Sequence, residues 1–114
     1  RLASRTRGII AADRLLRAAT YDGHHALGWS DAGALAVGAR ADFVAVQMDS
    51  TRTAGGGASV ENVVFAAAAP DVTDVVVDGR AVVIDRKHVT VPDVEVELAS
   101  AIGDLMDTSV EAAR

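Results

Sequence analysis

Hydrophobic residues near the start of the chain recur at intervals of three and four, which places their side chains on one face of an α-helix. Asp13 lies where the first turn of that helix would be, and a negative charge there favours the helix dipole. Gly28 stops the pattern. The spacing predicts an amphipathic helix over residues 12–27, with a stripe of Ala12, Leu15, Leu16, Ala19, Gly23, Ala26 and Leu27.

Two short apolar runs follow within residues 33–48, and glycine and polar residues separate them. They predict two strands joined by a turn. Residues 51–58 hold three consecutive glycines and predict a mobile loop. Ser59 can cap a helix that runs on to Pro70, because proline cannot continue a helix.

The clearest local signal is a β-hairpin. Residues 72–77 and 81–84 are rich in valine and flank Asp78-Gly79, a dipeptide that accepts the positive φ angles of a tight turn. After Pro92, which suits a first helical position, apolar residues again recur at helical spacing; these are Val94, Leu98, Ile102, Leu105 and Met106. Helix, strands, helix, hairpin and helix together predict an α+β fold.

Composition and charge narrow the choice of function. The chain has 114 residues, a net charge of −5 and only four aromatic residues, which argues against a nucleic-acid surface of clustered cations and stacking rings. It has no cysteine, so it forms no disulfide and no thiolate zinc site, and we expect a cytoplasmic protein. No apolar run approaches the ~20 residues that cross a bilayer. The length also falls far short of a complete (β/α)₈ barrel of ~250 residues.

His24 and His25 are the most evident candidates for metal ligands. Neighbours on a helix point about 100° apart, whereas a helical metal pair needs i, i+4 spacing. We therefore expect no metal there, and interpret the pair as histidines at a helix end, where a cation or a hydrogen bond to the backbone is favourable. His88, after the hairpin, stands alone.

Three other patterns resemble known motifs without meeting their requirements. Residues 28–33 (GWSDAG) have the second glycine one place late for a nucleophile elbow. The glycines of residues 55–57 lack the lysine of a phosphate loop. The aspartates around the hairpin are typical of turns; they are Asp71, Asp74, Asp78 and Asp85. A catalytic carboxylate pair would need pKa values driven apart by burial.

Three segments in fixed order resemble the amidohydrolase superfamily. Residues 15–28 (LLRAATYDGHHALG) and 33–44 (GALAVGARADFV) are similar to its C-terminal signature, and residues 72–83 (VTDVVVDGRAVV) to its closing hairpin. The resemblance implies that residues 1–28 form the last helix of a TIM-type metal-dependent hydrolase barrel. Residues 29–91 would form the C-terminal half of a small composite β domain, and residues 92–114 a terminal helix. One departure is Arg86 after Asp85, where family hairpins usually have glycine, so we expect a longer or differently shaped turn.

Within the superfamily, residues 1–4, 26–29 and 48–55 look most like formimidoylglutamate deiminases, which release ammonia from a formimidoyl group in histidine degradation. A guanine or cytosine deaminase remains an alternative within the same frame, and an independent small β-rich binding module is the alternative from another class. The resemblance implies a zinc-dependent parent enzyme whose metal ligands, acid/base carboxylate and substrate-binding residues all precede Arg1. No catalytic, substrate-binding or metal residue is thereby assigned to this chain.

The chain opens at Arg1 without a methionine, and no apolar stretch of signal-peptide length follows, so we expect a start inside a longer protein. The expected partner is the rest of the parent enzyme, that is, the barrel and the N-terminal strands. Without that partner, the exposed stripe of the first helix predicts self-association. We expect neither a nucleic acid nor a membrane as partner.

Overall fold

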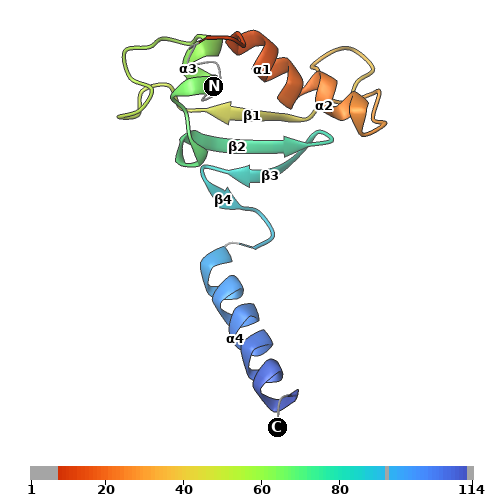
Figure 1. The fold of residues 1–114 in the computed structure, drawn as a ribbon, viewed down its shortest axis with the longest axis vertical. Coiled ribbons are helices and arrows are strands. Elements are labelled where there is room, and N and C mark those ends of the chain that lie inside the picture. The colour runs from red at the N-terminus through yellow and green to blue at the C-terminus, as the bar shows by residue number, and fades with distance from the viewer. Residues whose placement is uncertain (1–7, 92, 113–114) are drawn as a thin grey trace.

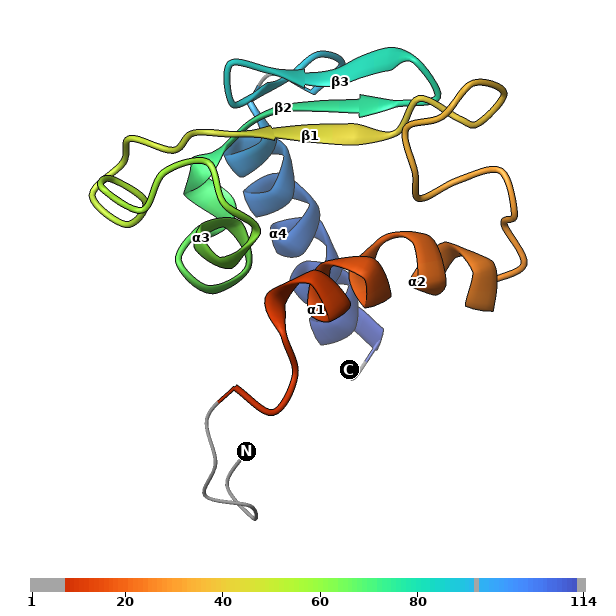
Figure 2. The same cartoon turned by 90° about the horizontal axis from the view of Figure 1, so that it is seen from above.

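A computed structural model describes residues 8–91 and 93–112 of the chain, and the side chains up to residue 108. Four strands form one antiparallel sheet in the order β1-β2-β3-β4. Helices α1 and α3 lie beside β1, and α4 leaves from the opposite edge, after β4 (Figure 1). Seen from above, α1, α2 and α3 all lie on one side of the sheet (Figure 2). The α+β class is therefore confirmed for this part of the chain.

The first predicted helix is two helices, α1 (Ala12–Ala19) and α2 (Tyr21–Ala26). Thr20 interrupts them with φ −117° and ψ −99°, and its hydroxyl donates to the Leu16 carbonyl oxygen at 2.8 Å. The predicted stop at Gly28 is confirmed: its φ is +85°, and the amides of Gly28 and Trp29 donate to carbonyl oxygens of α2. This is the left-handed ending that glycine favours.

Only the second of the two strands predicted within residues 33–48 forms, as β1 (Phe43–Val46). The first apolar run is an irregular segment that is open to solvent, with Leu35 71% and Val37 109% exposed. Apolar residues form a strand only when another strand pairs with them, and none in the described residues pairs with this segment. The expectation of a strand there is wrong for the structure described.

The predicted hairpin is confirmed as β2 (Val72–Val77) and β3 (Arg80–Ile84), with Asp78 and Gly79 both at positive φ. A second turn leads from β3 to β4 (Lys87–His88), and its central residues, Asp85 and Arg86, also have positive φ, 48° and 64°. Both are two-residue turns with the backbone twist that hairpins prefer. The expectation that Arg86 lengthens or reshapes the second turn is therefore wrong.

Helix α3 (Val60–Phe65) is shorter than predicted, since the alanines after it are not helical. Ser59 caps it as predicted, accepting from the Asn62 amide at 3.2 Å. Pro70 lies in a short 3₁₀ helix, η1 (Ala69–Asp71), which leads into β2. Helix α4 (Val94–Ala112) begins two residues after Pro92.

Little of the described chain is buried. Half of the residues are hydrophobic, yet the only fully buried hydrophobic residues among those described are Ala12 and Ala32. The radius of gyration is 18.9 Å, against about 13 Å for a compact chain of ~100 residues. The described residues therefore expose large apolar side chains from nearly every element.

Candidate functional site

The two adjacent histidines do not converge on a common point. His24 is half-buried, with its Nδ1 2.7 Å from the Thr20 carbonyl oxygen and its ring 6.0 Å from that of Trp29. His25 is exposed and stacks at 4.2 Å on Tyr21. His24 thus makes the backbone hydrogen bond expected for a histidine near a helix end.

His88 is occupied by the turn that follows β4. Its Nδ1 accepts hydrogen bonds from the backbone amides of Thr90, at 3.3 Å, and Val91, at 3.1 Å. A nitrogen that accepts from two amides does not offer its lone pair to a metal. Across residues 8–91 and 93–112, no three histidine, aspartate or glutamate side chains gather closely enough to hold an ion. The described residues thus present no group of side chains arranged to hold a metal ion.

The four aspartates around the hairpin also stay apart, and three of them behave as expected. Asp78 and Asp85 occupy the turns. Asp74 lies within β2 and accepts from the Asp85 amide at 3.2 Å; the Thr73 hydroxyl and then this amide lower the pKa of its carboxyl. Asp71 is completely buried, at 0% exposure. Asp71 still closes the short turn before β2, as predicted, whereas the prediction of a turn residue is wrong for Asp74, which lies inside the strand.

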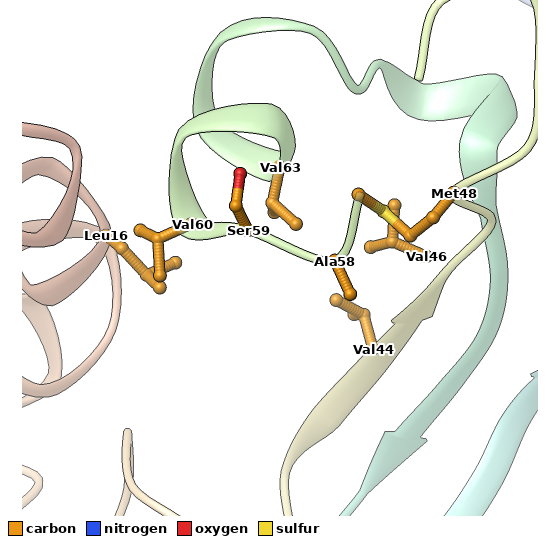
Figure 3. A pocket seen from close by; sticks show the side chains of 8 residues that line it. All are labelled: Leu16, Val44, Val46, Met48, Ala58, Ser59, Val60 and Val63. Carbon is orange, nitrogen blue, oxygen red and sulfur yellow. The ribbon is translucent and has the colours of Figure 1, made fainter. Parts of the chain in front are cut away.

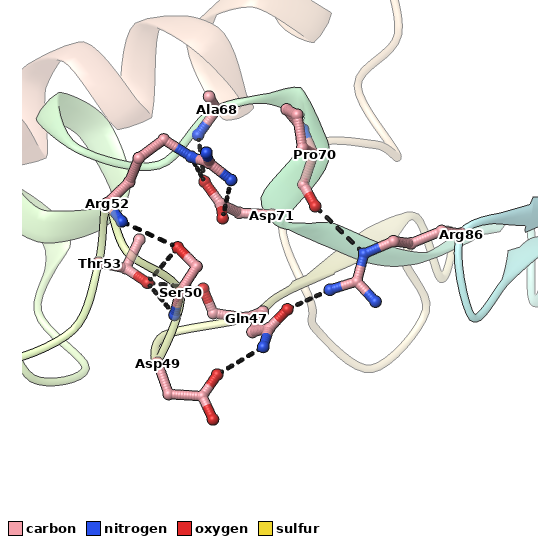
Figure 4. A network of polar contacts seen from close by, with 9 residues as sticks. All are labelled: Gln47, Asp49, Ser50, Arg52, Thr53, Ala68, Pro70, Asp71 and Arg86. Carbon is pink, nitrogen blue, oxygen red and sulfur yellow. Dashed lines mark hydrogen bonds and ion pairs between the residues drawn. The ribbon is translucent and has the colours of Figure 1, made fainter.

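Asp71 is the centre of a polar cluster that ties the loop after β1 to the start of β2 (Figure 4). Arg52 grips its carboxylate with two hydrogen bonds of 2.8 Å, and the Ala68 amide donates a third, also of 2.8 Å. These hydrogen bonds, Arg52 first, and one from the Ser50 hydroxyl hold the pKa of the Asp71 carboxyl well below its usual range. A carboxylate so occupied does not act as a general base.

The loop over residues 51–58 is anchored at Thr53. Thr53 is 1% exposed, and its hydroxyl donates to the Gln47 carbonyl oxygen at 3.1 Å. Arg86 joins the same cluster, donating to the Pro70 carbonyl oxygen at 3.2 Å and to the Gln47 side chain. Among the described residues, no buried polar side-chain atom lacks a hydrogen-bond partner. The cluster therefore acts as a structural clamp between the loop after β1 and the start of β2.

No pattern along the chain indicates this clamp. Arg52 and Asp71 lie 19 positions apart, and neither stands in a periodic pattern. The one available signal was an arginine in a glycine-rich loop that precedes the hairpin.

Two apolar hollows flank the contact between α1 and α3. The first, of about 420 Å³, lies between Leu16 of α1, the start of α3 and strand β1 (Figure 3). Its other lining residues are Val44, Val46, Met48, Ala58, Ser59, Val60 and Val63. The second, of about 470 Å³, is lined by Ile9, Ile10, Leu15, Val64 and Phe65. Neither hollow is lined by a titratable side chain, so both suit packing against apolar surface.

The chain belongs to the amidohydrolase family, whose sequence profile matches residues 1–82. The fold and the signatures noted in the sequence agree with this class.

Individual relatives are deaminases and a hydrolase. The chain is 32% identical over 90 residues to a 5-methylthioadenosine/S-adenosylhomocysteine deaminase of Acetivibrio thermocellus, a match over 78% of this chain and 21% of that protein. It is 33% identical over 87 residues to an s-triazine hydrolase of Gordonia rubripertincta, over 75% of this chain and 18% of that protein. The chain thus spans about a fifth of the length of these relatives.

A solved structure gives the same relationship in three dimensions. An adenosine deaminase from Xanthomonas campestris, solved with bound zinc, matches with a TM-score of 0.81 and 29% identity. The match covers 94% of this chain and 25% of that one. These relatives are not formimidoylglutamate deiminases, so they support the superfamily prediction and not its finer part.

No helix in the described part of the chain is both long enough and apolar enough to span a membrane.

Proposed function

We propose that the chain is the C-terminal supporting part of a zinc-dependent amidohydrolase that deaminates the adenine ring of a nucleoside. The likeness to the zinc-bound adenosine deaminase carries the proposal, since it combines 29% identity with a TM-score of 0.81 over 94% of the chain. The 5-methylthioadenosine/S-adenosylhomocysteine deaminases among the relatives, including that of Shouchella clausii at 35% identity, support the same substrate class.

The proposed reaction replaces the exocyclic amino group of the adenine ring by oxygen. Water supplies the oxygen, the carbon–nitrogen bond breaks, and the amino group leaves as ammonia, without any oxidant or reductant. The described residues offer no metal-binding group, and the two hollows are apolar. We therefore assign the chemistry to the rest of the enzyme and a supporting role to this chain.

The exposed apolar surface is the basis for that supporting role. Leu15 and Leu16 of α1 line different hollows, so the helix presents apolar side chains in two directions. Strand β1 pairs only with β2 among the described residues, and its outer edge can accept a further strand. We propose that the barrel covers α1 and that an N-terminal strand of the enzyme pairs with β1.

N-formimidoyl-L-glutamate is the second candidate substrate, supported by the resemblance of residues 1–55 to formimidoylglutamate deiminases. In both substrates water attacks an amidine-like carbon. The two differ in the residues that the enzyme needs to bind the rest of the substrate molecule. Two carboxylates call for arginines in bidentate pairing, whereas a nucleobase calls for amide groups and stacking rings.

An ammonia-release assay on the intact enzyme separates these candidates. We would assay 5′-methylthioadenosine, S-adenosylhomocysteine and adenosine beside N-formimidoyl-L-glutamate, guanine and cytosine. Turnover confined to the adenine nucleosides supports the proposal. Turnover confined to N-formimidoyl-L-glutamate makes the second candidate correct. Turnover of guanine or cytosine alone refutes both candidate substrates and leaves the family assignment unchanged.

The reading frame upstream of Arg1 tests the enzyme against an independent binding module. A barrel sequence with a His-x-His motif supports the enzyme, and an unrelated domain supports the module.

Self-association of the separate 114-residue chain tests the exposed surface. Each leucine that leaves water gains about 1.5–3 kcal/mol, so Leu16 and Leu27, the latter 76% exposed, favour association between copies. Light scattering is expected to show species larger than a monomer. A strict monomer at high concentration, with α1 fully protected from hydrogen exchange, would contradict the supporting role.

A further inference from the structure

Helix α4 projects from the sheet after β4 and exposes every side chain that the structure describes on it (Figure 1). Six of these residues are large and hydrophobic, and four of the six follow one another at intervals of four, four and three, which places them on one face of the helix. These four form the α4 stripe: Val94 (44% exposed), Leu98 (58%), Ile102 (53%) and Leu105 (68%). A helix with one apolar face normally buries that face against another surface.

Acidic residues border the α4 stripe on both sides. At 100° per residue, Glu95 falls to one side of the stripe, and Glu97 and Asp104 to the other. No basic residue occurs between positions 93 and 112. Two α4 helices packed stripe to stripe would therefore place carboxylates against carboxylates with no cation to compensate, as at mismatched e and g positions of a coiled coil. The surface that fits the stripe is an apolar groove with arginine or lysine along its rim.

The related structure shows how much further chain could supply such a groove. Its match leaves out 6% of this chain, about seven residues, whereas α4 has 19. Most of α4 is thus matched in a chain of which this one covers only a quarter, so most of the related enzyme lies outside the matched part.

We infer that the α4 stripe docks into an apolar groove with a basic rim on the rest of the same enzyme chain, outside the 114 residues. This contact would hold the small β domain against the barrel. The inference rests on the proposed function only for the existence of that remainder, and not on the identity of the substrate.

Substitutions on two faces of α4 in the intact enzyme test the inference. Ile102→Asp places a charge in the stripe, and the matched control Val96→Asp adds the same charge at a β-branched residue on the opposite face, which is 68% exposed. We expect Ile102→Asp to lower the hydrogen-exchange protection of the α4 amides by about tenfold or more, and Val96→Asp to leave it unchanged. Glu97→Lys is expected to loosen α4 as well, by opposing the basic rim.

Light scattering and activity complete the experiment. An unchanged oligomeric state in all variants, with α4 loosened only by Ile102→Asp and Glu97→Lys, supports docking on the same chain. If Ile102→Asp instead dissociates an oligomer, the occupant is a second copy and the inference is overturned. Equal protection in Ile102→Asp and Val96→Asp also overturns it. Absence of deaminase turnover beside a protected α4 refutes the proposed function and leaves the docking intact.

Discussion

Asn62 provides the most direct test of the way in which the loop before α3 is held. Its side-chain amide donates to two carbonyl oxygens, those of Thr53 at 2.8 Å and Gly57 at 2.9 Å. Gly56 passes so close that a Cβ there would lie 2.4 Å from the Asn62 Nδ2. Asn62 thus joins the first turn of α3 to both ends of the glycine run.

Asn62→Ala removes both hydrogen bonds. A neutral hydrogen bond contributes about 0.5–1.5 kcal/mol net, so the two together predict a loss of about 1–3 kcal/mol in the free energy of unfolding. Asn62→Asp keeps the shape of the side chain but turns carboxylate oxygens toward two carbonyl oxygens. It is therefore expected to cost more than Asn62→Ala.

Urea unfolding of the 114-residue chain, at a concentration too low for self-association, measures these losses at constant m-value. Ser59→Ala is the control, because it removes the cap of α3, at about 1 kcal/mol, and leaves the loop bonds intact. Hydrogen exchange should show the loop amide of Ala54, which donates to the Ser50 carbonyl oxygen, losing protection only in the Asn62 variants. An Asn62→Ala variant as stable as the wild type, or an Asn62→Asp variant no worse than Asn62→Ala, would refute the reasoning.

Three further predictions concern acid, glycine and metal. Because Arg52 lowers the pKa of Asp71 in the fold, the stability that Asp71 contributes is complete above its unfolded pKa of about 3.9 and is lost as the pH falls below it. Asp71→Asn should therefore destabilise the chain at neutral pH and flatten its acid-unfolding curve; an unchanged curve would argue against the ion pair. Gly79→Ala, at φ 73°, should cost about 1–2 kcal/mol, whereas Gly103→Ala in α4 should gain up to about 1 kcal/mol; in thermal melts, a stabilised Gly79→Ala would contradict the first prediction and a destabilised Gly103→Ala the second. After dialysis the 114-residue chain should hold no stoichiometric zinc by elemental analysis; one zinc per chain, lost in His24→Ala, would show that the histidine is a ligand.

Several features of the fold depend on neighbours in the chain and were open to prediction from it. Asp78-Gly79 forms the expected turn because its positive φ angles are a local preference of those two residues. Ser59 caps α3 and Gly28 ends α2 for the same kind of reason: each satisfies backbone groups within a few positions of itself. The three family signatures likewise lie in short stretches, so the superfamily was evident before the structure.

Features that depend on distant segments were not open to prediction. The apolar run before β1 has the composition of a strand, but strand formation needs a pairing partner, and none is present in the described residues. The Asp85-Arg86 turn is tight although arginine does not favour a positive φ. Hydrogen bonds from Arg86 to Pro70 and Gln47, 16 and 39 positions away, help to hold it there.

Sequence patterns alone predicted the Asp78-Gly79 hairpin, the Ser59 cap, the helix end at Gly28 and the family to which the chain belongs. Tertiary structure alone decided that Asp71 is buried against Arg52 and that the glycine-rich loop is held, because the partners in these contacts lie far apart along the chain. It also revealed how few hydrophobic side chains the described residues bury. The spacing of hydrophobic residues predicts which face of a helix or strand is apolar. Only the tertiary structure shows whether other residues of this chain bury that face or leave it exposed.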